Sequence, residues 1–357
     1  VLIAFIFSSV LAFQFYGQSS AGEFEFKVDS LKKVIKVSEK NDTVLVKSYE
    51  RLTVAFYPKD FDSVHFYGNK TIKVIESLNS SSSLVSNVCL QSKANVYNVK
   101  GNVFYMSGNV LKALESYHSG LKINKQLSNL QAQASLMSNL GALYNSLGDV
   151  ERSIDYNMQS LKIREELNIP KDIAISLNNI GAIYSAQKEY SDAHQFYNRS
   201  LKIRKSLGDK KGISSVYNNL GILKREEGKF DEALTYYQKG LEIDKEIDNK
   251  DGIIISLINI GNYYQRKGEF DEAMICFLKG LEVASQVNYE EDEVNCLQSI
   301  ASIYLEKNDL VKAKENAEMS FNKTKKLGYH SLIEGTSKLL FSIYELEGDA
   351  EKALPML

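Results

Sequence analysis

Residues 214–228 read SSVYNNLGILKREEG, and residues 231–247 read DEALTYYQKGLEIDKEI. Apolar residues recur in both stretches at intervals of three and four, the spacing of one face of an amphipathic helix. Gly228 stands between the two stretches, where a helix commonly ends in a left-handed residue. Asp231 follows, where an acidic side chain stabilises free N–H groups and the helix dipole. The sequence here predicts two consecutive helices joined by a short turn.

The same two patterns recur every 40 residues along most of the chain. One position is glycine in five successive copies, a second glycine position lies seven residues later, and a small residue usually follows five residues after that. The first position holds Gly101, Gly141, Gly181, Gly221 and Gly261, and then Ala301 and Phe341. Self-similarity at a fixed period indicates units that bury their apolar faces against their neighbours. Residues 84–357 are therefore predicted to form seven helix pairs in register, the last of them truncated.

These positions resemble the tetratricopeptide repeat (TPR). In one unit the matching residues are Leu220, Gly221, Gly228, Ala233, Tyr237 and Gly240. We predict that Gly221 and Ala233 lie where the paired helices cross, because a missing side chain lets the backbones approach. The 40-residue period exceeds the common period of about 34 residues and is similar to the extended repeats of kinesin light chains and related bacterial arrays. The resemblance implies an all-α fold, a right-handed α-solenoid of stacked antiparallel helix pairs.

The chain before residue 84 departs from this register. Residues 43–80 resemble a divergent first unit, so residues 23–83 are predicted to be a lead-in and a divergent first TPR. Residues 1–13 read VLIAFIFSSVLAF, which is too short to span a bilayer, since a spanning helix needs about 20 residues. Their length fits the apolar core of a secretory signal peptide. We expect residues 1–22 to be an N-terminally incomplete signal peptide of an exported, periplasmic or extracellular protein; the alternatives are a buried helix or a truncated membrane anchor.

Composition and motifs point away from several function classes. The 43 basic and 45 acidic residues give a net charge of −2, whereas a nucleic-acid-binding surface needs a clustered basic excess. The three cysteines exclude a fully paired intrachain disulfide set. The sequence has no HExxH, CxxC or GxSxG motif and no phosphate-binding glycine loop. We therefore expect no catalytic residue, no metal site and no cofactor, and a protein that is not an enzyme.

Helical periodicity identifies candidate binding residues on the first helix of each unit. The resemblance implies that these helices line the concave face, and the stripe opposite their packed side is predicted to be open there. One position of that stripe holds Asn139, Asn179, Asn219 and Asn259, and neighbouring positions hold Asn102, Asn178, Asn218, Asn262, Arg225, Gln265 and Arg266. An amide both donates and accepts hydrogen bonds, so a ladder of amides can pair with an extended peptide backbone. This resembles the asparagine ladder of kinesin-light-chain-type arrays. The alternative is that these asparagines satisfy contacts between helices.

Two hypotheses of function follow. The first is an exported scaffold whose concave groove captures an extended protein or peptide segment through the asparagine ladder. The second is the sensory TPR region of a larger membrane-bound signalling protein, with a histidine kinase, cyclase or transcription-regulator domain beyond Leu357. Neither hypothesis involves nucleic acid bound by this chain or a small-molecule cofactor, and a membrane enters only through a possible missing C-terminal segment.

Overall fold

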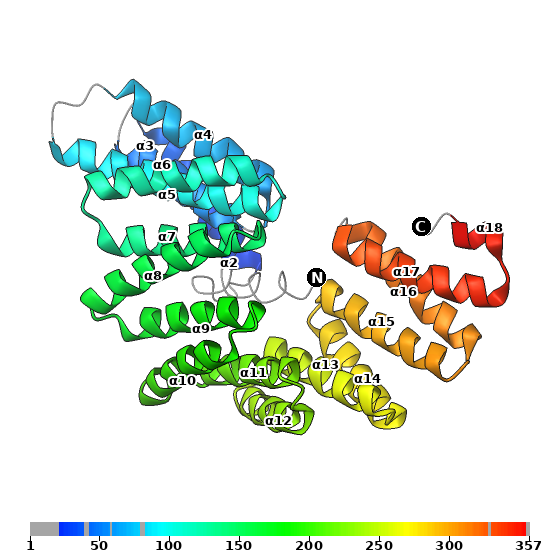
Figure 1. Cartoon of the computed structure of the whole chain (residues 1–357). Helices are drawn as coiled ribbons and strands as arrows, with labels where there is room; N and C mark the ends of the chain where they lie inside the picture. The colour runs from blue at the N-terminus through cyan, green and yellow to red at the C-terminus, as the bar shows by residue number, and fades with distance from the viewer. Residues whose placement is uncertain (1–20, 39–42, 58, 79–82, 328–329, 355–357) are drawn as a thin grey trace. The chain divides into compact units, whose positions relative to one another are not determined.

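The computed structural model describes residues 21–38, 43–57, 59–78, 83–327 and 330–354 (Figure 1). All regular elements in these ranges are helices, which confirms the all-α prediction. The chain divides into two compact units, one up to Gln187 and the other from Lys188 onward. The predicted signal peptide lies outside the described residues except for its last two positions, Ala21 and Gly22. Within the described ranges, no helix combines the length and the apolar character that crossing a membrane requires.

The first unit consists of helices that follow one another with short connections. They are α2 (Ala21–Val37), α3 (Thr43–Phe56), α4 (Phe61–Ser77), α5 (Ser83–Met106), α6 (Val110–Gln126), α7 (Leu130–Ser146), α8 (Val150–Glu166) and α9 (Pro170–Ala186). Residues 43–77, where a divergent first repeat is predicted, contain α3 and α4, which pack on each other and on α5. Each later helix contacts the next, so helix pairs stack in succession.

The second unit continues the same alternation. Its helices are α10 (Tyr190–Ser206), α11 (Lys210–Glu226), α12 (Phe230–Glu246), α13 (Lys250–Lys267), α14 (Phe270–Gln286), α15 (Glu290–Glu306), α16 (Leu310–Leu327), α17 (His330–Glu347) and α18 (Ala350–Ala353). Helices α11, α13 and α15 are the first helices of their repeats, and each contacts the next first helix in the stack. We call the first helix of a repeat its A helix and the second its B helix.

Local chemistry sets the ends of these helices. Helix α11 ends at Glu226, and Gly228 follows with φ of 79°, so the predicted left-handed turn is confirmed. Asp231 lies in the first turn of α12, next to its free N–H groups. The same turn chemistry recurs at Gly268, where φ is 77°. The 40-residue register therefore fixes where each helix pair bends.

The glycine position inside the A helices is a close contact between paired helices. A Cβ atom placed on Gly221 would lie 2.4 Å from Cε1 of Tyr237 on α12. On Gly261 it would lie 2.6 Å from Cε1 of Phe277 on α14. Ala233, at the small position of α12, is buried against the same interface. These distances confirm the predicted helix crossing at Gly221, and they leave no room for any larger side chain without a shift of the ring.

Candidate functional site

The predicted site residues lie on the A helices of both units, and each unit is described by itself. In the first unit they are Asn102 on α5, Asn139 on α7, and Asn178 and Asn179 on α9. In the second unit they are Asn218, Asn219 and Arg225 on α11, and Asn259, Asn262, Gln265 and Arg266 on α13. Five of the eight asparagines, Asn139, Asn178, Asn179, Asn218 and Asn219, are less than a tenth exposed.

In the first unit the asparagine amides bond to one another across neighbouring helices. The Asn139 Nδ2 on α7 donates to Oδ1 of Asn98 at 2.9 Å and to Oδ1 of Asn102 at 3.3 Å, both on α5. The hydroxyl of Tyr117 on α6 donates to the same Asn102 oxygen at 2.8 Å. Asn139 and Asn102 therefore belong to a network that joins α5, α6 and α7, as the interhelix alternative requires.

Asn218 in the second unit is also engaged between helices. Its Oδ1 accepts a hydrogen bond from Ser256 Oγ on α13 at 3.1 Å, and its Nδ2 donates to the Ser214 carbonyl at 3.4 Å. Its amide also lies close to Gly240 on α12, where an added Cβ would meet Nδ2 at 3.2 Å. The Asn218 side chain is thus enclosed by α11, α12 and α13.

Two asparagines on α13 differ from Asn102, Asn139 and Asn218. Asn259 is half-buried and Asn262 is exposed, and neither side-chain amide has a hydrogen bond to any residue in the described ranges. They are three residues apart, and Arg266 follows four residues after Asn262, so the three side chains lie on one face of the helix. This stripe, which we call the α13 polar stripe, offers amide donors and acceptors that no described residue uses.

Ile222 explains why Asn259 lacks one of the two acceptors that Asn139 has. Shifted by three repeats of 40 residues, the Asn139 partners Asn98 and Asn102 correspond to Asn218 and Ile222. An isoleucine side chain cannot accept a hydrogen bond, so the counterpart of the Asn139–Asn102 bond is lost. The Asn218 oxygen accepts from Ser256 and makes no hydrogen bond to Asn259, so the Asn259 amide has neither bond.

The same isoleucine leaves a second polar group without a partner. Tyr237 corresponds to Tyr117, and the position of the Tyr117 acceptor, Asn102, is again Ile222. The Tyr237 hydroxyl is a buried polar atom with no hydrogen-bond partner in the described structure. Burial raises its pKa to about 12, while nearby Arg225 lowers it and Glu226 raises it. Both charged residues belong to the last turn of α11, so this hydroxyl lies under that end of the A helix.

The charged and longer polar residues of the site are held by their neighbours. The Arg225 guanidinium pairs with Glu226 Oε1 at 2.9 Å. The Arg266 guanidinium lies 4.2 Å from the centroid of the Phe230 ring, a cation–π contact that leaves its N–H edges for other acceptors. The Gln265 Nε2 donates to Ser302 Oγ on α15 at 3.0 Å. Arg266 is thus preoriented at one end of the α13 polar stripe.

A second group of interacting side chains was not identified from the sequence. His194 Nε2 lies 2.8 Å from Glu227 Oε1, and Glu227 also pairs with Lys224 and Lys229. Burial raises the pKa of Glu227, but the side chains of Lys229, Lys224 and His194 lower it to about 2. Together with Tyr190 and Ser191, residues of this group line a pocket of about 400 Å³. Only the fold brings α10 and the α11–α12 turn together, so the sequence carries no signal for this group.

Several solved structures have a fold similar to that of this chain. Solved structures with a similar fold include the apo quorum sensor NprR from B. thuringiensis (15% identity, 99% of this chain and 95% of that chain, TM-score 0.63) and apo RapI (18% identity, 79% and 98%, TM-score 0.60). The Rap conjugation gene regulator of plasmid pLS20, in complex with the Phr* peptide, is also similar (14% identity, 94% and 93%, TM-score 0.58). At these identities the likeness concerns the fold alone.

Comparison of the amino-acid sequence with curated proteins and with family profiles identifies one family. No curated protein matches the chain. The tetratricopeptide repeat profile matches residues 92–166, 131–206, 172–246 and 212–286. These matches overlap and together span residues 92–286, which is more than half of the 357 residues. The chain therefore belongs to the tetratricopeptide repeat family.

Proposed function

We propose that this chain is a binding scaffold, not an enzyme, and that it holds an extended peptide or protein segment along its A helices. The observation that carries the proposal is the α13 polar stripe, in which the amides of Asn259 and Asn262 have no partner among the described residues. A peptide backbone offers one donor and one acceptor per residue, which is what a free amide can satisfy. Binding therefore completes hydrogen bonds that folding leaves open.

Two longer side chains near the free asparagines are held in place by neighbouring residues. Arg266 is oriented by the Phe230 ring, and Gln265 is bridged to Ser302 on the next A helix. The asparagine ladder of this proposal is centred on α13, because Asn139 and Asn218 use their amides within the fold. The structure of the pLS20 regulator with its Phr* peptide supports a peptide as the class of ligand.

Export is part of the proposal and rests on the apolar run of residues 1–13. The alternative is that the chain is the sensory region of a larger membrane-bound signalling protein, in which peptide capture is relayed to an output domain. The two differ in the sequence after Leu357, where an apolar span of about 20 residues and an output domain would establish the alternative. N-terminal sequencing of the mature protein tests export, and an intact first segment would refute it.

The binding proposal is tested with a random heptapeptide library displayed on phage and panned against the chain. Selected peptides are then titrated by fluorescence polarisation against the unmodified chain and against the double variant Asn259→Ala with Asn262→Ala. Two lost hydrogen bonds of about 1 kcal/mol each weaken binding by roughly tenfold to thirtyfold. Asn139→Ala is the matched control, because it stands at the same repeat position with its amide engaged by α5. Failure to select any peptide, or equal loss in the control, contradicts the proposal.

A further inference from the structure

Two neighbouring A helices of the second unit carry opposite charges at the same repeat position. Helix α13 has Arg266 there, and α15 has Glu306, 40 residues later. Glu226 on α11 is charged too, but its carboxylate pairs with Arg225 at 2.9 Å. The remaining A helices carry uncharged residues at this position, namely Met106, Ser146, Ala186 and Leu346. The repeat therefore does not require a charge here, and the charges of α13 and α15 need another explanation.

Neither charge is used by the fold. Arg266 contacts the Phe230 ring but has no hydrogen bond or ion pair with a described residue. Glu306 is exposed and likewise has neither. The C-terminal ends of α13 and α15 are adjacent, since Gln265 Nε2 donates to Ser302 Oγ at 3.0 Å, yet Arg266 and Glu306 do not pair with each other. The two helices thus present a positive and a negative group that do not neutralise one another.

Helix α15 has a polar stripe like that of α13. Four of its residues, at intervals of four, three and four, share one face of the helix. We call them the α15 polar stripe: Asn295, Ser299, Ser302 and Glu306. The Asn295 amide, like those of Asn259 and Asn262, has no hydrogen bond to a described residue. The two stripes therefore combine free amides with one charge of each sign.

The other charges near the two stripes lie at a distance or are paired. The first turns of α13 and α15 hold charged residues about 20 Å along the helix from the stripe charges. Lys267 and Lys307, which directly follow the stripe charges, pair with aspartates on B helices. Glu269, in the turn after α13, makes no ion pair with the α13 charge. On the next A helix, α17, the exposed Glu345 has the same sign as the α15 charge. Along these A helices the charge therefore changes sign between α13 and α15.

The opposite charges of the two stripes select among peptides. We propose that the peptide bound by the A helices of the second unit carries an acidic and a basic residue two positions apart. The proposal rests on the function proposed above and names the class of ligand. The acidic side chain pairs with Arg266, the basic one pairs with Glu306, and the peptide backbone bonds to the free amides of the two stripes.

The spacing of the two charges fits an extended chain. Packed helices lie about 8–10 Å apart, and α13 contacts α15. Alternate side chains of an extended chain lie on one face, about 7 Å apart. The long side chains of arginine and glutamate cover the difference. Consecutive residues of the peptide point to opposite faces, so an adjacent charge pair does not reach both partners.

Charge reversal tests the proposal with the random heptapeptide phage library. Peptides selected by the unmodified chain should contain an opposite-charge pair two positions apart about threefold more often than the unselected library. Glu306→Lys makes both stripe charges positive, so its selected peptides should carry two acidic residues at that spacing. Arg266→Glu makes both negative and should select two basic residues. In fluorescence polarisation, either reversal should weaken binding of an original peptide by roughly threefold to tenfold, and reversing the opposing charge of the peptide should restore it.

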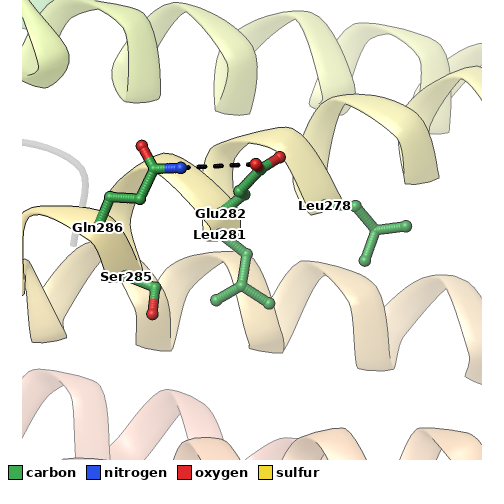
Figure 2. Close-up of a pocket in the computed structure, with 5 residues that line it drawn as sticks. All are labelled: Leu278, Leu281, Glu282, Ser285 and Gln286. Carbon is green, nitrogen blue, oxygen red and sulfur yellow. Dashed lines mark hydrogen bonds between the residues drawn. The ribbon is translucent and has the colours of Figure 1, made fainter.

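Glu242→Lys on the B helix α12 is the matched control. It makes the same charge change as Glu306→Lys on an exposed residue, and it installs the residue that three other repeats carry at that position, Lys122, Lys162 and Lys202. Glu242 is a better control than its counterpart Glu282 on α14. The Glu282 carboxylate accepts a 3.5 Å hydrogen bond from Gln286 at a pocket of about 470 Å³ on that helix (Figure 2). The control should select the same peptides as the unmodified chain.

The outcomes separate this proposal from the function on which it rests. Selected peptides that lack the charge pair, but bind the double variant Asn259→Ala with Asn262→Ala more weakly, overturn the charge selection and leave peptide capture standing. A library that yields no peptide overturns both. A shift of the same size in Glu242→Lys would assign the preference to net charge. Circular dichroism should show unaltered helix content in every variant, so that a changed selection reports binding and not folding.

Discussion

Tyr237→Phe is expected to stabilise the protein, although it removes a polar atom from a residue that is only 1% exposed. The hydroxyl has no hydrogen-bond partner in the described structure. Leaving a buried polar group unsatisfied costs about 1–3 kcal/mol. The ring itself is needed, because it fills the space left by Gly221, and phenylalanine keeps that ring. The equivalent residue in the next repeat is already phenylalanine, Phe277, in the same contact with Gly261.

Tyr117→Phe is the matched control, and its expected change in the free energy of unfolding has the opposite sign. Tyr117 has the same repeat position and the same 1% exposure, and its ring packs on Gly101 as Tyr237 packs on Gly221. Its hydroxyl, however, donates to Asn102. Losing that bond should destabilise the protein by about 0.5–1.5 kcal/mol. The free energies of unfolding of the two variants should therefore differ by roughly 1.5–4.5 kcal/mol on the same estimates.

Guanidinium unfolding followed by far-UV circular dichroism measures both effects, provided that the m-value is unchanged. A loss of 1 kcal/mol or more in Tyr237→Phe would show that the hydroxyl has a partner, and the reasoning from Ile222 would be wrong. Ile222→Asn then supplies the missing acceptor, as Asn102 does for Tyr117. A double-mutant cycle with Tyr237→Phe should give a favourable coupling of about 1 kcal/mol. Zero coupling would exclude the hydrogen bond.

Two further effects can be measured on the same protein. Gly221→Leu should destabilise the protein by about 3 kcal/mol through overpacking against Tyr237. Gly335→Ala should instead raise the free energy of unfolding by up to about 1 kcal/mol, since the nearest atom to its added Cβ is 3.7 Å away. Equal melting temperatures of the two variants would refute the helix crossing at Gly221. Asp292 should make stability fall as pH rises from about 4 to 7, by at most about 1.4 kcal/mol per pH unit. Burial, Glu291 and Asp251 raise its pKa to about 7, so the folded state holds a proton that the unfolded state releases. Asp292→Asn should abolish this slope in a melting series, and an unchanged slope would assign it elsewhere.

Asp292 also illustrates why the repeat register helps to explain individual residues. The equivalent residue three repeats earlier is Asp172, whose backbone oxygen accepts a 3.4 Å hydrogen bond from Arg164. The position of Arg164 is Ala284 in the later repeat. The later repeat keeps the acid without that arginine, and burial, Glu291 and Asp251 raise the pKa of Asp292 to about 7.

The parts of the fold that depend on local chemistry could be predicted from the sequence. Gly228 adopts the left-handed turn after α11 and Asp231 lies in the first turn of α12, because turn geometry and dipole complementarity act within a few residues. The Gly221 crossing could be predicted because it recurs with its aromatic partner. The use of each asparagine could not, because it depends on residues about 40 positions away. Asn139 and Asn259 have the same repeat position, yet only Asn139 meets acceptors on the preceding A helix.

Ile222 links stability to the proposed binding. Its side chain packs with the apolar cluster of α12 and α13, but it withholds a hydrogen bond from both Tyr237 and Asn259. An asparagine at position 222 could accept hydrogen bonds from the Tyr237 hydroxyl and from the Asn259 amide, as Asn102 does from Tyr117 and Asn139. These bonds would stabilise the fold, and the Asn259 amide would no longer be free to bind a peptide. Ile222 therefore accounts for the Tyr237 hydroxyl without a partner and for one of the two hydrogen bonds that the Asn259 amide lacks, so a gain in stability at this position should come with weaker peptide capture.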